Sequence, residues 1–227
     1  MESTNTLSDE QLRVVEDVKT GQTILLTGPA GTGKSFLMEH LCDMLGESGI
    51  PFSITASTGA AASNIGGTTL HAWSGIGLGN GEFDDIMERV RWNKPAVKRI
   101  KSCEVLMIDE ISMIPADLLD LLDKVFREVR RYEAPFGGIQ MCFVGDFAQL
   151  RPVKGEFCFK AASWKAANVR IHQLTHIFRQ EDADFAKALN QLRMGELDAE
   201  SKALLLSRYR VVDGSPDEIP VSIVSTN

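Results

Sequence analysis

Short apolar runs alternate with longer, mixed segments along this chain of 227 residues. The length and flanking turn residues of five runs predict buried strands at 23–27, 52–56, 104–108, 140–144 and 169–174. Apolar spacing and capping residues predict helices at 8–19, 34–45, 116–131 and 184–194. Strands that alternate with helices indicate an α/β fold, in which a mainly parallel sheet carries helices on both faces. In such a fold, ligands bind at the carboxyl ends of the strands.

The first predicted strand leads directly into GPAGTGKS, residues 28–35, and a helix follows. Strand, glycine-rich turn and helix together form the context of a phosphate-binding loop. Gly31 and Gly33 allow backbone N–H groups to converge on phosphate oxygens, and the helix adds its positive amino-terminal end. We expect Lys34 to reach the terminal phosphates and Ser35 to hold Mg²⁺. The residues expected to bind the nucleotide are Gly28, Pro29, Ala30, Gly31, Thr32, Gly33, Lys34 and Ser35.

Two carboxylates stand at the end of the third apolar run, in VLMIDEISM at 105–113. Asp109 fits a residue that holds Mg²⁺, and Glu110 fits a base that orients an attacking water. The pair favours hydrolysis over a small-molecule kinase, because a kinase has to keep water out of its site. A polar strand end without catalytic function is the alternative interpretation.

Three single residues are weaker candidates. Gln149, in GDFAQLRPV, could sense the γ phosphate through its amide, or it could belong to an ordinary polar loop. Arg179, in LTHIFRQ, could stabilise charge on a transferring phosphoryl group, although a lone arginine is more often a surface or salt-bridge residue. Gln11 could bind adenine, but Ser8 and Gln11 also match a capping box at the start of the first helix.

Two segments rich in small residues and hydroxyls follow the second predicted strand, ASTGAAA at 56–62 and GGTTLHAW at 66–73. Such residues allow a phosphodiester chain to approach the backbone closely. His71 and Trp73 could stack on bases. The alternative is a loop packed tightly against the sheet, with Trp73 in the core.

The net charge of −7 argues against a nucleic-acid partner, because such partners prefer basic proteins. The charge is uneven, however, since RVRWNKPAVKRIK at 89–101 holds six basic side chains and no acidic one. This segment is either a local patch that binds a phosphate backbone or a solvated helix face.

The regions outside these motifs suggest an insertion and a chain end. Four glycines in SGIGLGNGEF at 74–83 predict a loop, which with 84–101 forms a small insertion. Residues 211–219 read as a linker and PVSIVSTN as the start of a strand. We therefore expect a fragment that continues into a further domain.

The cysteines and the amino terminus bear on the cellular setting. The four cysteines lack a C-x-x-C spacing and are expected to be reduced, which fits an intracellular protein. No apolar run approaches the length of a membrane span, and the amino terminus does not resemble a secretory signal. We expect no membrane partner.

Taken together, the motifs resemble the first motor domain of a superfamily-one helicase of the Pif (petite integration frequency) family, related to RecD. The resemblance covers nearly the whole chain, with GPAGTGKS, ASTGAAA, GGTTLHAW, IDEISM, PFGGIQ, GDFAQLRPV and LTHIFRQ in the family's order. It implies a RecA-like P-loop NTPase domain over residues 1–215, with a wedge-like insertion at about 74–101. Residues 216–227 would then be the linker and first strand of a second motor domain.

The resemblance also implies a role for individual residues. Gln11 matches the glutamine that reads adenine, Gln149 the γ-phosphate sensor and Arg179 the arginine finger. Asp109 matches the Mg²⁺ ligand and Glu110 the catalytic base, with ATP and Mg²⁺ as cofactors. Segments of the family that contact single-stranded DNA contain the residues Thr58, Gly59, Thr69 and His71.

The function implied by the resemblance is an ATP-dependent 5′-to-3′ DNA helicase, with roles in DNA repair, recombination and telomere maintenance. Its partners would be single-stranded DNA and duplex junctions, and the chain would be a monomer in isolation. The family's nucleotide lies between two motor domains, so we expect slow hydrolysis from this chain alone. The compartment would be the nucleus or mitochondrion of a eukaryote, or otherwise the cytoplasm. A P-loop ATPase or kinase with a different substrate, and a non-enzymatic binding module, are the alternatives.

Overall fold

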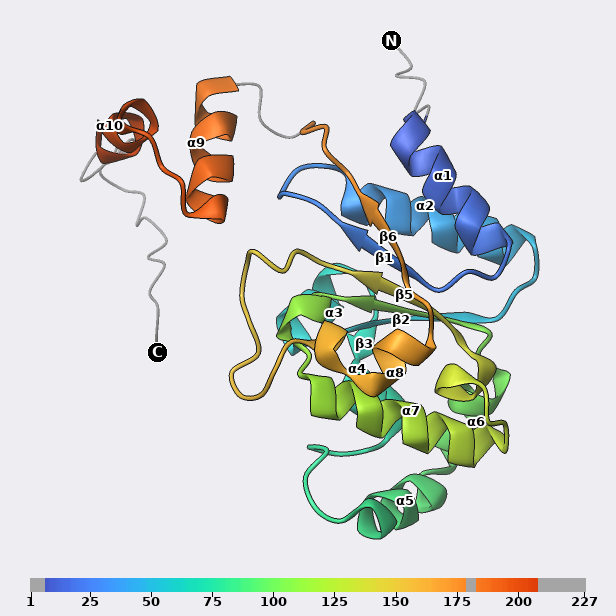
Figure 1. Ribbon diagram of the computed structural model, residues 1–227. Coiled ribbons are helices and arrows are strands. Elements are labelled where there is room, and N and C mark those ends of the chain that lie inside the picture. Colours follow the sequence, from blue (N-terminus) through green and yellow to red (C-terminus); the bar gives the residue numbers. More distant parts are fainter. Residues whose placement is uncertain (1–6, 179–182, 208–227) are drawn as a thin grey trace, which may run out of the picture. The chain divides into compact units, whose positions relative to one another are not determined.

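The structure, a computed structural model, describes residues 7–178 and 183–207 (Figure 1). The chain forms two units, residues 1–179 and 180–227. Three features expected from the sequence lie outside the described residues: Arg179, the linker at 211–219 and the strand after it. Within the described ranges, no helix combines the length and apolar character needed to cross a membrane.

The first unit contains a six-stranded sheet in which every neighbouring pair is parallel, in the order β3-β2-β4-β5-β1-β6. The strands are β1 (Ile24–Thr27), β2 (Phe52–Ala56), β3 (Thr68–Thr69), β4 (Val105–Asp109), β5 (Gln140–Val144) and β6 (Arg170–Gln173). Five of them confirm the positions of the predicted strands to within one residue at each end. The expected burial is wrong for β6, which lies at the edge of the sheet and is mostly exposed. The sixth, β3, has only two residues and was not predicted.

The residues of β1, β4 and β5 alternate between two cores, one on each face of the sheet. In β1, Ile24 and Leu26 pack with α1 (Asp9–Lys19) and α2 (Lys34–Glu47), whereas Leu25 belongs to the core on the opposite face. The helices of that opposite face are α4 (Leu70–Ser74), α5 (Phe83–Trp92), α6 (Lys94–Ser102), α7 (Ala116–Arg130) and α8 (Ala162–Ala166) (Figure 1). Both faces are thus covered, which confirms the predicted α/β architecture.

Several short elements complete the unit. Segments that the sequence suggested were loops contain α3 (Gly59–Asn64) and α4. Three 3₁₀ helices lie at Ile111–Met113, Pro135–Gly138 and Cys158–Lys160. All four cysteines are free, and three of them are buried.

The predicted insertion packs into the main core. Ile86 and Val90 of α5 and Ile100 of α6 are fully buried in the same cluster as the inner face of α7. Burial of this kind contributes roughly 1.5–3 kcal/mol for each aliphatic side chain. Helices α5 and α6 therefore belong to the helical layer that covers the α7 face of the sheet.

Arginines of the basic segment make contacts within the fold. The guanidinium groups of Arg89 and Arg99 donate to backbone carbonyls in 72–76, at 2.8 to 3.1 Å. Arg91 forms an exposed ion pair with Glu128 at 2.8 Å. These contacts use half of the six basic side chains, and the three lysines of the segment are exposed.

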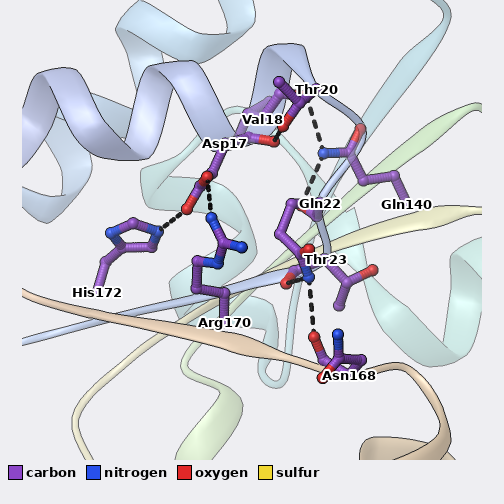
Figure 2. Close-up of polar contacts among 9 residues, drawn as sticks. All are labelled: Asp17, Val18, Thr20, Gln22, Thr23, Gln140, Asn168, Arg170 and His172. Atoms are coloured by element: carbon purple, nitrogen blue, oxygen red, sulfur yellow. Dashed lines mark hydrogen bonds and ion pairs between the residues drawn. The ribbon is translucent and has the colours of Figure 1, made fainter.

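A polar network ties the end of α1 to the sheet edge opposite the strands' carboxyl ends (Figure 2). The Nε2 of Gln140 donates to the carbonyls of Val18 and Gln22, at 3.0 and 2.9 Å. The Nε2 of Gln22 donates in turn to the carbonyl of Asn168 at 2.8 Å, next to β6. These bonds hold α1, β5 and β6 together at one end.

The second unit contains α9 (Ala183–Met194) and α10 (Ala199–Ser207). The predicted helix at 184–194 is confirmed by α9. Lys187 of α9 bonds Asp198 at 3.1 Å and Glu200 at 3.2 Å, and the Nε2 of Gln191 donates to Asp198 at 2.7 Å. These polar contacts link the two helices to each other.

Candidate active site

A pocket of about 700 Å³ lies where β1, β4 and β5 end. Its phosphate-loop lining consists of Ala30, Gly31, Gly33, Lys34 and Ser35. Gln11, Asp109, Glu110 and Gln149, all proposed from the sequence, line it as well. Three residues of the loop do not line the pocket. The carbonyls of Gly28 and Pro29 accept from Nζ of Lys34, and Thr32 is buried with its hydroxyl donating to the carbonyl of Pro29.

The backbone conformation of the phosphate loop is suited to binding an anion. Gly31 and Gly33 have φ values of +83° and +84°, a left-handed conformation that glycine adopts without a Cβ penalty. Gly33 precedes the first turn of α2 and provides no side-chain cap. The first N–H groups of a helix have no partner within the helix, so this end is suited to an anion.

Lys34 lies against the loop itself. Its Nζ donates to the carbonyls of Gly28 and Pro29, at 2.8 and 2.9 Å. Gly28 has no room for a side chain, since a Cβ there would lie 2.4 Å from the carbonyl oxygen of Leu174. The two hydrogen bonds hold the ammonium group of Lys34 against the loop, and Lys34 lines the pocket.

Two adjacent carboxylates face the same pocket from the end of β4. The backbone N–H of Glu110 donates to Oδ1 of Asp109 at 2.9 Å, and Glu110 has a left-handed φ of +52°. Burial raises the pKa of Asp109 above its ordinary value. Burial also raises the pKa of Glu110, and the charges of Asp109 and Asp146 add to this while Lys34 opposes it. A raised pKa makes Glu110 a better proton acceptor.

Asp146 is a residue that sequence reasoning missed. It follows β5 and is 2% exposed. Its Oδ2 accepts from Nε2 of Gln149 at 3.1 Å, and its Oδ1 accepts from the backbone N–H of Ala148 at 3.1 Å. An aspartate directly after an apolar strand was the same signal that identified Asp109, and it was available here in GDFAQ.

Gln11 caps the first helix and also lines the pocket. The predicted capping box is confirmed: its Oε1 accepts from the backbone N–H of Ser8 at 2.9 Å, and its own N–H donates to Oγ of Ser8 at 3.3 Å. The side chain also lines the pocket, and its Nε2 lies 3.2 Å from where a Cβ on Gly33 would be. The cap thus fixes the amide at the edge of the pocket.

Phe178 is a second pocket residue that the sequence did not single out. Its ring carbon Cδ2 would lie 3.7 Å from a Cβ on Gly33, and its backbone N–H donates to the carbonyl of Gly31 at 2.8 Å. The side chain is 56% exposed. An exposed aromatic at the rim of a pocket is suited to stacking against a planar ligand.

The residues expected to contact DNA lie at the same edge of the sheet. Thr58 and Thr69 cap α3 and α4 by accepting from the backbone N–H groups of Ala61 and Ala72, at 3.2 and 3.3 Å. Gly59 is the first residue of α3. The pairing of β2 with the short strand β3 brings the two helix starts close together.

His71 and Trp73 differ in their surroundings. Trp73 is 2% exposed and packs edge-to-face against Phe126, with ring centroids 5.7 Å apart. The structure therefore supports a core role for Trp73 and not the stacking one. His71 is half-buried, and burial lowers its pKa below the ordinary value.

A groove of about 770 Å³ adjoins this edge, and Thr58 and His71 line it. The glycine-rich loop contributes Leu78, which is 81% exposed, and the segment after β5 contributes Val153, which is 93% exposed. Lys124 and Lys154 line the groove together with Asp117 and Asp120. The groove thus combines apolar side chains, hydroxyl groups and both signs of charge.

Comparison with known proteins identifies relatives over most of this chain. Residues 6–203 match the family described as PIF1-like helicase. The ATP-dependent DNA helicase PIF1 of Mus musculus is 46% identical over 200 residues, which are 86% of this chain and 30% of that protein. The ATP-dependent DNA helicase RRM3 of Saccharomyces cerevisiae is 40% identical over 232 residues, 97% of this chain and 32% of that protein.

Solved structures resemble the fold closely. Pif1 helicase from Candida albicans superposes with a TM-score of 0.89 at 38% identity, over 95% of this chain and 50% of that one. Pif1 helicase from Bacteroides, in complex with ADP-AlF3 and single-stranded DNA, gives a TM-score of 0.80 at 31% identity, over 93% of this chain and 52% of that one. This chain thus spans about half of the solved chains and about a third of the two curated relatives.

Proposed function

This chain belongs to the PIF1-like helicase family, and we propose that it is a motor domain of an ATP-dependent 5′-to-3′ DNA helicase. The observation that carries the proposal is the pocket that joins Lys34 and Ser35 to Asp109 and Glu110. A phosphate loop facing two carboxylates is the arrangement that hydrolysis of a nucleoside triphosphate requires. Hydrolysis would be coupled to movement along single-stranded DNA and to duplex unwinding.

ATP would bind with its phosphates at the start of α2. The backbone N–H groups of the loop and the ammonium of Lys34 would bind the phosphate oxygens, because they offer convergent donors and positive charge. This requires Nζ of Lys34 to exchange the carbonyls of Gly28 and Pro29 for phosphate.

The same pocket contains oxygen donors suited to Mg²⁺, the hydroxyl of Ser35 and a carboxylate oxygen of Asp109. Among the described residues, no group of three or more His, Cys, Asp or Glu side chains could hold a metal ion. Such a sparse donor set fits Mg²⁺, which usually keeps several waters and substrate phosphates as ligands. The ion, when bound, would neutralise phosphate charge.

Glu110 would take the proton of the attacking water. Its raised pKa and its position beside Asp109 support this role. Gln149 would report the presence of the γ phosphate, and its hydrogen bond to Asp146 fixes its starting position. Arg179, proposed from the family resemblance, would supply a positive charge to the transferring phosphoryl group.

The groove lined by Thr58 and His71 would bind single-stranded DNA. The starts of α3 and α4, including Gly59 and Thr69, would approach the phosphates, since small residues and N–H groups allow a close contact. The neutral imidazole of His71 would stack on a base. The insertion at 74–101 would meet a duplex junction, because its glycine-rich loop forms one wall of the groove.

The relatives are named as DNA helicases, and from this we infer an intracellular setting. The nucleus or mitochondrion of a eukaryote is the finer proposal, with the cytoplasm as the alternative. We also propose that the chain is monomeric in isolation. A P-loop ATPase or kinase with a substrate other than nucleic acid, or a binding module without catalysis, would differ in the experiment that follows.

The test is DNA-stimulated ATP hydrolysis by the full-length protein. We expect single-stranded DNA to raise turnover, and Lys34→Ala to lower it by at least about 100-fold, the scale for loss of one charge-stabilising donor. Lys19→Ala, which removes an exposed lysine from the end of α1, is the matched control and should leave turnover unchanged. If single-stranded DNA does not change turnover, the result would favour a P-loop ATPase or kinase with a substrate other than nucleic acid. DNA-stimulated turnover in Lys34→Ala would refute the assignment of Lys34.

A further inference from the structure

One carboxylate outside the pocket connects two of its walls. Glu10, in the first turn of α1, accepts two hydrogen bonds from Thr175, a residue just beyond β6. Its Oε2 accepts from the backbone N–H at 3.0 Å, and its Oε1 accepts from the hydroxyl at 2.7 Å. These two bonds lower the pKa of Glu10, so the side chain is a charged acceptor at neutral pH. Hydrogen bonds to a charged group are stronger than neutral ones.

The residues near this contact both line the nucleotide pocket. Gln11 follows Glu10 in α1, and Phe178 lies three residues beyond Thr175. Both reach the space above Gly33, because a Cβ there would lie 3.2 Å from Nε2 of Gln11 and 3.7 Å from the ring of Phe178. An amide and an aromatic ring therefore approach the same point from α1 and from the segment after β6.

The segment that carries Phe178 is attached to the phosphate loop as well. The backbone N–H of Leu174 donates to the carbonyl of Thr27 at 2.8 Å, and that of Phe178 donates to Gly31 at 2.8 Å. The ring of His176 packs edge-to-face on Phe178, with centroids 4.4 Å apart. These contacts fix the segment to the loop, whereas Glu10 fixes it to α1.

The other end of α1 has its own attachment to β6, which Figure 2 shows. Oδ1 of Asp17 pairs with Arg170 at 2.5 Å, and Oδ2 of Asp17 contacts Nε2 of His172 at 2.7 Å. Asp17 lies two helical turns from Glu10, about 10 Å along the axis. The helix is thus tied to β6 and its continuation at both ends, and the Glu10 contact is the one at the pocket.

We propose that Glu10 is a positioning residue, which through Thr175 sets the separation between the Gln11 amide and the Phe178 ring and so selects adenine over guanine. The proposal depends on the nucleotide-binding role proposed above. A glutamine amide can match the N6 and N7 edge of adenine but not the O6 and N7 edge of guanine. Hydrogen bonds discriminate between bases strongly only when the groups that form them are held in place.

The test compares two acidic residues of the same helix turn. Glu10→Ala removes the contact, and Asp9→Ala removes an exposed carboxylate of the same turn that has no hydrogen bond to Thr175. Affinities for ATP and for GTP are measured with Mg²⁺ in the full-length protein, by calorimetry. We expect Glu10→Ala to lower the affinity for ATP by about fivefold, the effect of one hydrogen bond, and to change the affinity for GTP little. Asp9→Ala should leave both affinities as they are.

A role in folding alone is separated by the ratio of the two affinities. A variant that is only less stable would lose ATP and GTP affinity equally, and that result would overturn the proposal. Thr175→Val keeps the shape of the side chain but loses the hydroxyl donor, so it should lower the ratio in part, and Thr175→Ser should restore it. In the Phe178→Ala background, Glu10→Ala should cause no further fall in the ratio.

Failure of this inference differs from failure of the proposed function. If the pocket does not bind nucleotide phosphates, Lys34→Ala will leave the affinities for ATP and GTP unchanged. If the pocket binds them but Glu10 has no positioning role, Lys34→Ala will lower the affinities for both nucleotides and Glu10→Ala will behave like Asp9→Ala.

Discussion

The backbone N–H of Glu110 donates to Oδ1 of Asp109 at 2.9 Å, so the carboxylate of Asp109 is held against the backbone of the neighbouring acidic residue. Glu110 adopts its left-handed conformation to make this turn, at a cost of about 1–3 kcal/mol. The bond occupies one oxygen of Asp109 and does not involve Oδ2. The turn would thereby separate the two roles that we propose, metal binding by Asp109 and proton acceptance by Glu110.

Glu110→Gln is expected to retain ATP binding and to lose hydrolysis. The amide keeps the size of the side chain but cannot accept a proton, so turnover in the full-length protein should fall by about 10²- to 10⁴-fold. Single-turnover hydrolysis and equilibrium binding of ATP measure the two effects separately. Glu88→Gln, on the exposed side of α5, is the control and should behave like the unaltered protein.

His71→Ala is expected to weaken binding of single-stranded DNA. Loss of one stacked base contact corresponds to about 1–3 kcal/mol, or roughly five- to 150-fold in affinity. Because burial lowers the pKa of His71 below 6.5, its ordinary value, the ring is neutral at pH 7 and above. Fluorescence anisotropy with a labelled oligonucleotide should therefore show the same effect of the substitution at pH 7 and pH 8. An effect that disappears between these two values would indicate a charged histidine on a phosphate.

Trp73 variants should change stability and leave DNA affinity unaltered. Trp73→Ala is expected to lower the free energy of unfolding by about 3–5 kcal/mol, because it opens a cavity beside Phe126. Trp73→Phe should cost less, since it keeps an aromatic ring and removes a buried indole N–H that has no hydrogen-bond partner. Denaturant unfolding measures the first effect and anisotropy the second. Weakened DNA binding by a folded Trp73→Phe protein would contradict the core role.

Thr58 should be tested with serine as well as alanine. Thr58→Ala removes the cap of α3 and is expected to lower the free energy of unfolding by about 0.5–2 kcal/mol, whereas Thr58→Ser keeps an oxygen that can accept from Ala61. Thermal and denaturant unfolding measure this difference. Equal losses in both variants would mean that the threonine methyl group, and not the cap, stabilises this region.

The central strands β1, β4 and β5 could be predicted because they are buried on both faces. Residues 141–144 of β5, for example, are apolar without interruption, and a glycine follows them. The short elements β3, α3 and α4 could not be recognised by periodicity. The two residues of β3 make a single strand repeat, and the five or six residues of each helix make less than two turns. Their existence depends on the pairing of β2 with β3 and on threonine caps.

The pocket was predictable as far as its residues belong to sequence motifs. Lys34, Asp109 and Glu110 were identified by their positions after strands, and the structure brings them to one pocket. Phe178 and Glu10 have no such signal, because their positions depend on how α1 lies against β6. Tertiary packing of this kind is not encoded in the spacing of any one segment.

The most direct test of the account is a crystal structure of this chain with Mg²⁺ and a non-hydrolysable ATP analogue. We expect Nζ of Lys34 to have left the carbonyls of Gly28 and Pro29 for the terminal phosphates. Mg²⁺ should contact Ser35, and it should contact Asp109 directly or through a water. Glu110 should face the γ phosphorus. A nucleotide bound elsewhere, with Lys34 still on the loop carbonyls and the two carboxylates remote from the phosphates, would contradict the account.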